Sequence, residues 1–173
     1  MIESEFTFLL FSILPALVVG GLAFYFFHTN SKNEDLRRRF LIQRENQKTA
    51  LPLKLQAYER MTLFLERISP GKILFRVTPV SEDAKSYASL VINTIEQEFD
   101  HNLAQQIYLS ADCWDYIKTA KNATIGLIRK ASTQEKVDNP DKLKEVILTA
   151  LMEKPAPTDA ALAFIKREVR NII

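Results

Sequence analysis

The chain has 173 residues, a formal net charge of +2 and 47% hydrophobic residues, with only 4 Gly and 7 Pro. These proportions exclude a disordered low-complexity chain and a collagen-like repeat. One Cys excludes a disulfide framework and a metal site built from several thiolates, and two His leave little for a histidine-rich site. We therefore expect no metal site and no cofactor, in a domain of ordinary size.

The N-terminal region contains an uncharged run of 22 residues, residues 6–27. As a helix this run rises about 33 Å, enough to cross a hydrocarbon core of roughly 30 Å. We predict a transmembrane anchor within residues 1–31. Two alternatives are a buried helix of a soluble protein and a cleaved signal peptide. A signal peptide starts with basic residues, whereas this chain starts with Glu3 and Glu5.

Charged residues on either side of the apolar run predict its orientation. Acidic residues precede the run, whereas Lys32 and the cluster Arg37, Arg38 and Arg39 follow it. Positive charge marks the cytoplasmic side, so we expect an external N-terminus and a cytoplasmic C-terminal part. The arginine cluster is also expected to lie at the surface of anionic lipid.

Small residues recur every fourth position within the run, at Ser12, Ala16 and Gly20. Such a stripe lets two membrane helices approach closely. It indicates a possible homo-oligomer.

Residues 32–79 carry 11 basic and 5 acidic residues, a net charge of +6. Helical spacing of apolar residues predicts one long helix here, ended by residues 69–71. Its first part, residues 32–51, is predicted to be a basic juxtamembrane stalk with some coiled-coil character. Pro52 marks the joint to a second part with a wide buried face, as a kink or a first-turn proline. The sequence alone leaves open whether the helix continues through Pro52.

Residues 52–173 are predicted to form a small cytoplasmic bundle of about five helices, so the fold class is all-α. Residues 73–78 are β-prone but have no partner strand, and we expect an extended connector there. Helix starts are predicted at Ser81, Ser110, Asn139 and Thr158, each followed by an acidic residue within the first turn.

Known catalytic patterns are absent from the sequence: there is no phosphate-binding glycine loop, no nucleophile elbow and no zinc-binding His-Glu-x-x-His. His101 beside Asp100 is compatible with a general base, and Cys113 near a helix N-terminus with a reactive thiol. A surface histidine and a structural cysteine explain these two residues more simply. We therefore expect no enzyme, with a small membrane-tethered enzyme using His101 or Cys113 as the alternative.

The piece linking two predicted helices contains Gln105, Gln106 and Tyr108, shortly before Trp114. Amide and phenol groups in such a link either satisfy buried backbone groups or contact a partner. We name these four residues as the candidate partner contact. A membrane-tethered nucleic-acid-binding protein is a further alternative, although the net charge of −2 over residues 80–173 argues against it.

One stretch carries a resemblance: Glu98-Phe-Asp-His-Asn-Leu-Ala-Gln-Gln-Ile-Tyr-Leu-Ser-Ala-Asp-Cys-Trp114, followed by Ile117-Lys-Thr-Ala-Lys-Asn122. It resembles small bacterial single-pass membrane proteins of uncharacterised function. The resemblance implies an anchor in the bacterial inner membrane and a helical cytoplasmic domain, and it brings no catalytic residue. The sequence thus predicts a membrane-anchored scaffold or accessory subunit that contacts the lipid bilayer and binds a membrane or cytoplasmic protein partner.

Overall fold

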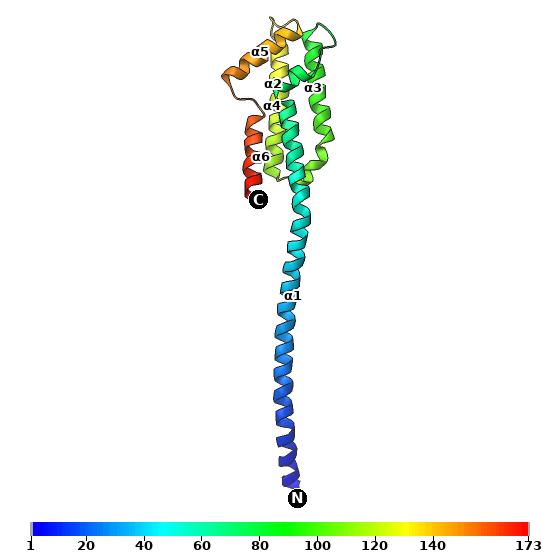
Figure 1. Ribbon diagram of the computed structural model, residues 1–173, viewed down its shortest axis with the longest axis vertical. Coiled ribbons are helices and arrows are strands. Elements are labelled where there is room, and N and C mark those ends of the chain that lie inside the picture. The colour runs from blue at the N-terminus through cyan, green and yellow to red at the C-terminus, as the bar shows by residue number, and fades with distance from the viewer. Residues whose placement is uncertain (1, 173) are drawn as a thin grey trace. The chain divides into compact units, whose positions relative to one another are not determined.

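The computed structural model describes the backbone of residues 2–172. It describes the side chains of residues 51–172 and, before them, those of residues 13, 15, 17–28, 37, 38, 41, 42, 45, 48 and 50. Over this backbone the chain is helical and contains no strand (Figure 1). The predicted all-α class is therefore confirmed.

The helices follow one another with short connections. In chain order they are α1 (Ile2–Ile68), α2 (Pro70–Arg76), α3 (Ala84–His101), the 3₁₀ helix η1 (Leu103–Tyr108), α4 (Ala111–Ser132), α5 (Pro140–Glu153) and α6 (Asp159–Ile172). Pro52 lies inside α1, which is assigned as helix on both sides of it.

The chain divides into two compact units, Met1–Ala50 and Leu51–Ile173. The first unit consists of the N-terminal part of α1. Its large apolar side chains are exposed on every side of the helix, for instance Leu17, Leu22, Phe24 and Phe27. Among the described residues, no helix is both long enough and apolar enough to span a membrane. Of the predicted anchor, residues 1–31, the side chains of residues 1–12, 14, 16 and 29–31 lie outside the described set.

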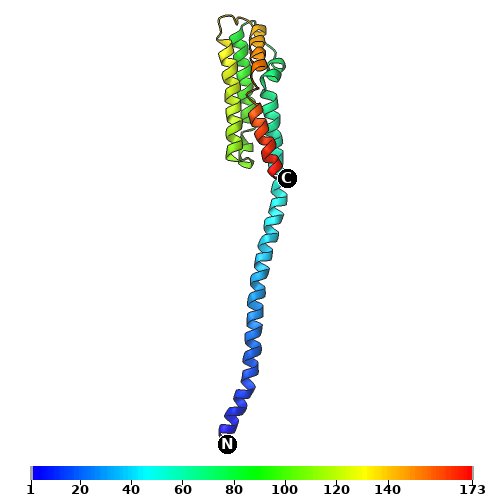
Figure 2. The ribbon, with the colours of Figure 1, turned by 90° about the vertical axis from the view of Figure 1, so that its left-hand side faces the viewer.

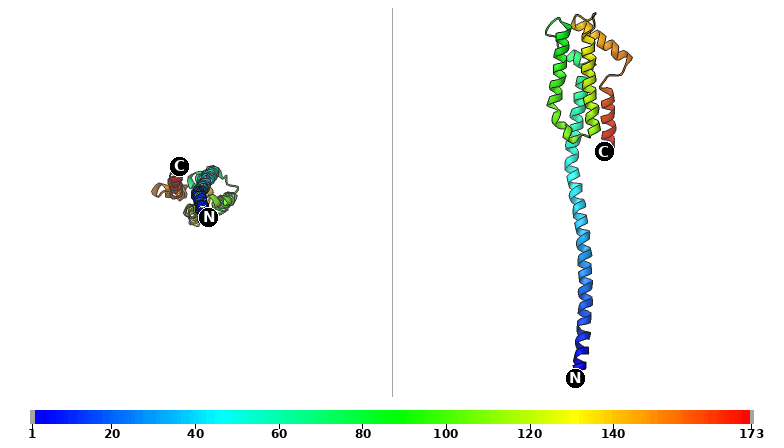
Figure 3. Two further views of the ribbon diagram at one scale, coloured as in Figure 1. Left: turned by 90° about the horizontal axis from the view of Figure 1, so that it is seen from below. Right: turned by 180° about the vertical axis from the view of Figure 1, so that it is seen from behind.

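The second unit is a helical bundle. The C-terminal part of α1 runs beside α3, α4 and α6, while α2 and α5 lie at the end of the bundle opposite η1 (Figures 1 and 3). Each of these helices contributes buried residues to one core, including Tyr58, Phe64, Leu74, Val91, Ile117, Leu143 and Ile165. Apolar residues spaced three and four apart produce this arrangement, because they place one face of each helix inward.

Two predicted helix starts are confirmed. The Ser110 side chain accepts a hydrogen bond from the backbone N–H of Cys113, and the Asn139 side chain accepts one from Lys142. Both are the expected N-cap geometry, since a side-chain oxygen satisfies an N–H group that the first turn leaves free. Pro140 occupies the first turn of α5, where its missing N–H costs nothing.

Two local predictions were wrong. Residues 73–76 are helical rather than extended, because Pro70 starts α2 and the short helix buries Ile73 and Leu74 in the core. Tertiary burial here outweighs the strand preference of the residues. The N-cap of α3 is Asp83 rather than Ser81, since the Asp83 side chain accepts a hydrogen bond from the N–H of Ser86 at 2.7 Å.

Candidate functional site

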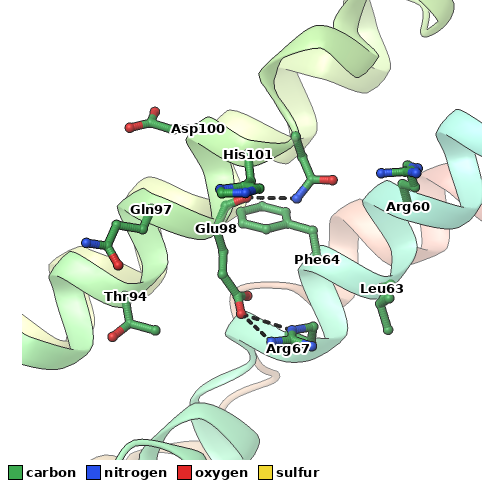
Figure 4. A pocket seen from close by; sticks show the side chains of 10 residues that line it. Arg60, Leu63, Phe64, Arg67, Thr94, Gln97, Glu98, Asp100 and His101 are labelled. Atoms are coloured by element: carbon green, nitrogen blue, oxygen red, sulfur yellow. Dashed lines mark hydrogen bonds and ion pairs between the residues drawn. The ribbon is translucent and has the colours of Figure 1, made fainter.

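A groove of about 700 Å³ runs between the C-terminal parts of α1 and α3 (Figure 4). Eight of its ten lining residues are polar or charged, and Leu63 and Phe64 are the two apolar residues among them. The lining residues are Arg60, Leu63, Phe64, Arg67, Thr94, Gln97, Glu98, Asp100, His101 and Asn102.

Glu98 is the electrostatic centre of this groove. Its Oε1 accepts hydrogen bonds from Arg67 Nη2 and Arg76 Nη1, each at 2.7 Å. Burial by itself would raise the pKa of Glu98, but the two guanidinium groups together hold that pKa below its ordinary value. The arrangement ties α3 to both α1 and α2 through one carboxylate. The two guanidinium groups neutralise the Glu98 carboxylate and keep it ionised, which does not suit it to act as a proton donor.

His101 also lines the groove, and its side chain is exposed. Figure 4 shows the Asp100 carboxylate pointing away from the His101 imidazole. Adjacent residues on a helix project about 100° apart, so an acid directly before a histidine does not orient it. The structure therefore does not assemble the acid–histidine pair that the enzyme alternative requires at this position.

Cys113 is fully buried in the bundle core. Burial and the nearby Glu168 carboxylate raise the pKa of the Cys113 thiol to about 12. The reactive-thiol alternative expected a pKa lowered by the helix N-terminus. The thiol instead faces the core and an acid, which agrees with the simpler interpretation of Cys113 as a structural cysteine.

Tyr58 lies beside the same two residues. Burial, followed by the charges of Glu168 and Cys113, raises the pKa of its phenol. Tyr58 Oη and Glu168 Oε2 are both buried, and neither has a hydrogen-bond partner of good geometry among the described atoms. Tyr58, Cys113 and Glu168 thus form a small polar cluster that joins α1, α4 and α6 within the bundle.

The predicted partner contact is divided by the structure into two environments. Gln105, Gln106 and Tyr108 belong to η1, which has no buried residue. Ile107, between them, is 73% exposed. Among the described residues none of these three side chains has a hydrogen bond to the protein. They therefore do not cap or satisfy the backbone around them.

Trp114 has a different environment. Its ring stacks on Phe99 with 5.2 Å between the ring centroids, and it packs against the core. The Phe99 ring also contacts Phe64 and lies under Lys121 Nζ. Trp114 is thus a packing residue that holds α3 against α4, and η1 lies in the connection between these two helices.

The predicted membrane residues lie in the first unit. Arg37 and Arg38 are exposed, and so is Gly20, where an added Cβ would meet no described atom within 4 Å. Ser12, Ala16 and Arg39 lie outside the described side chains. Their predicted roles in helix packing and lipid contact stay predictions.

Asp112 and Asp115, which the sequence places on one helical turn, are both exposed, and Asp115 forms an ion pair with Lys118 at 2.8 Å. Over the described part of the chain no three His, Cys, Asp or Glu residues come together as metal ligands would.

Sequence reasoning did not predict the ion-pair bridge from Glu98 to Arg67 and Arg76. No local sequence pattern indicates this bridge, because Glu98 lies 22 positions after Arg76 and 31 positions after Arg67.

The fold defines a class: over the described residues the chain is all-α, and residues 51–172 form a helical bundle with one core. Within that class the chain belongs to DUF7935, a family of unknown function, whose model matches residues 4–172. No curated protein and no solved structure matches the chain. The sequence resemblance to an uncharacterised family is confirmed to this extent, and the membrane nature of the protein is a matter of proposal.

Proposed function

We propose that this protein is a membrane-anchored scaffold or accessory subunit whose helical bundle binds a protein partner. The observation that carries the proposal is the exposed surface of η1, here called the η1 ridge: residues 103–108. It presents the apolar side chains of Leu103, Ile107 and Tyr108 together with the unbonded amides of Gln105 and Gln106. Exposed apolar side chains among free hydrogen-bonding groups are typical of a protein contact.

The anchor is supported by the side chains of the first unit. Phe24, Tyr25, Phe26 and Phe27 are consecutive and all largely exposed, so they cover the full circumference of the helix. A helix that is apolar all round needs an apolar environment. A lipid bilayer supplies that environment for residues 6–27, and the basic residues that follow would then lie on the cytoplasmic side.

The bundle itself supports a binding role rather than a catalytic one. The titratable candidates are dispersed: Cys113 is buried beside an acid, and His101 lacks an orienting partner. A rigid core below a short exposed helix suits a contact surface, because the scaffold presents its side chains with little loss of conformational entropy on binding.

Site-specific photo-crosslinking tests the proposal in intact cells. A photoreactive phenylalanine analogue replaces Ile107 in the full chain. The matched control carries it at Met152, an apolar residue that is even more exposed and belongs to α5, at the opposite end of the bundle. We expect one discrete adduct with another protein from position 107 and none from position 152. The same adducts from both positions, or an adduct only with a second copy of this chain, would contradict the proposal.

A further inference from the structure

A second groove, of about 320 Å³, lies between α1 and α6. Figure 2 shows α6 lying against the part of α1 that belongs to the bundle. The apolar lining comes from Leu55 and Tyr58 on α1 and from Ile165 and Val169 on α6. Leu55 and Tyr58 are three residues apart and Ile165 and Val169 four apart, so each pair lies on one face of its helix over about one turn, roughly 5–6 Å.

The walls of this groove differ in charge. On α6, Lys166 and Arg170 lie one turn apart and are exposed, and among the described residues neither has a hydrogen-bond or ion-pair partner. On α1 the wall carries Glu59 and Thr62. The groove therefore has an apolar floor with two available cations along one side and one acid along the other.

From this geometry we propose that the groove binds an amphipathic helix of the partner protein, with acidic residues flanking its apolar face. Two antiparallel helices with an apolar seam between them accept a third helix by packing of ridges into grooves. The acidic residues of that helix meet Lys166 and Arg170, and its apolar residues cover the partly exposed Leu55 and Val169, above the buried Tyr58 and Ile165. This inference rests on the proposed function and names the chemistry of the partner segment.

Two synthetic peptides test the inference against the purified full chain in mild detergent. Both share one apolar face with Leu at positions i, i+3, i+4 and i+7; one has Glu at its flanking positions and the other has Lys. Fluorescence anisotropy of a labelled peptide gives the Kd. We expect the Glu peptide to bind at least tenfold more tightly than the Lys peptide.

Charge reversal separates specific binding from adsorption to detergent. The variant Lys166→Glu/Arg170→Glu should weaken binding of the Glu peptide at least tenfold, while the control Arg129→Glu/Lys130→Glu, on the exposed last turn of α4, leaves it unchanged. Equal binding of both peptides, or equal binding to both variants, overturns the inference.

The mass of the assembly tests a second copy of this chain as the occupant. If that mass falls to the mass of one chain in the Lys166→Glu/Arg170→Glu variant, the groove binds a second copy and the inference is overturned. If the crosslink from position 107 persists while the peptide test fails, only the groove is rejected; if both fail, the proposed function is rejected as well.

Discussion

Phe99 and Trp114 stack with their ring centroids 5.2 Å apart and their planes 22° from parallel. Phe99 is near the end of α3 and Trp114 near the start of α4, so this pair fixes the two helices on either side of η1. The two rings pack against the core and hold together the helix ends on either side of η1. The six residues of η1 between these helix ends include no buried residue, so η1 lies at the surface beside this contact.

Replacement of Trp114 by Ala should lower the free energy of unfolding by about 2–3 kcal/mol, since it removes a large ring that packs partly inside the core. Replacement of Ile107 by Ala should change it by less than about 0.5 kcal/mol, because that side chain is mostly in solvent. Denaturant unfolding of the full chain, followed by circular dichroism, measures both. Equal losses would contradict the distinct environments of these two residues.

Glu98→Gln should destabilise the bundle by about 1–2 kcal/mol, because it removes the charge that holds Arg67 and Arg76, both of which are partly exposed. The matched control is Asp100→Asn, two residues further along the same helix, which should have almost no effect. Fluorescence of Trp114, the only tryptophan, reports unfolding of the bundle in both variants.

Glu98 should also make the stability depend on acidity. Its pKa is lowered in the folded state, so the stabilisation is present above the ordinary value of 4.5 and is lost as the pH falls through the folded pKa. The loss of stability below pH 4.5 should be smaller in Glu98→Gln than in the wild type. An identical acid dependence would contradict the bridge.

Cys113 gives the opposite dependence. Its pKa is raised from 9.0 to about 12, so the folded thiol keeps its proton while the unfolded thiol loses it. Its contribution is fully present below pH 9 and is lost progressively as the pH rises from 9 toward the folded pKa. In Cys113→Ala this part of the alkaline loss should disappear, leaving the part due to Tyr58 and to surface groups. A wild type and variant with parallel pH profiles would show that the thiol is not buried beside Glu168.

The start of α3 offers a direct comparison of two caps. Asp83→Ala removes the side chain that accepts from the N–H of Ser86 and should cost about 1 kcal/mol. Ser81→Ala, at an exposed residue before the helix, should cost almost nothing. If Ser81→Ala were the more damaging change, the helix would begin where the sequence pattern suggested.

Periodicity and capping residues predicted most of the helical arrangement. Ser110 and Asn139 were found as caps because each precedes a helical apolar pattern with an acid in the first turn. The exception was α2: seven residues are too few to show helical periodicity, and Ile73 and Leu74 look the same in a strand. Only their burial against the rest of the bundle decides the conformation.

The surface was less accessible to prediction. The residues of η1 could be singled out as unusual, but they lie at the surface beside the Phe99–Trp114 contact, which no local pattern shows. The groove between α1 and α6 joins residues more than 100 positions apart in the sequence, such as Leu55 and Ile165. In the sequence, Glu59, Lys166 and Arg170 could be interpreted only as separate charged surface residues.

The most direct test of a protein-binding scaffold is the mass and composition of the assembly that the full chain forms when it is extracted from its own membranes in mild detergent. The proposal predicts a companion protein in fixed stoichiometry, lost when Ile107→Asp and Tyr108→Ala disrupt the η1 ridge and retained in Met152→Asp. A chain that elutes alone as a monomer from those membranes would contradict it.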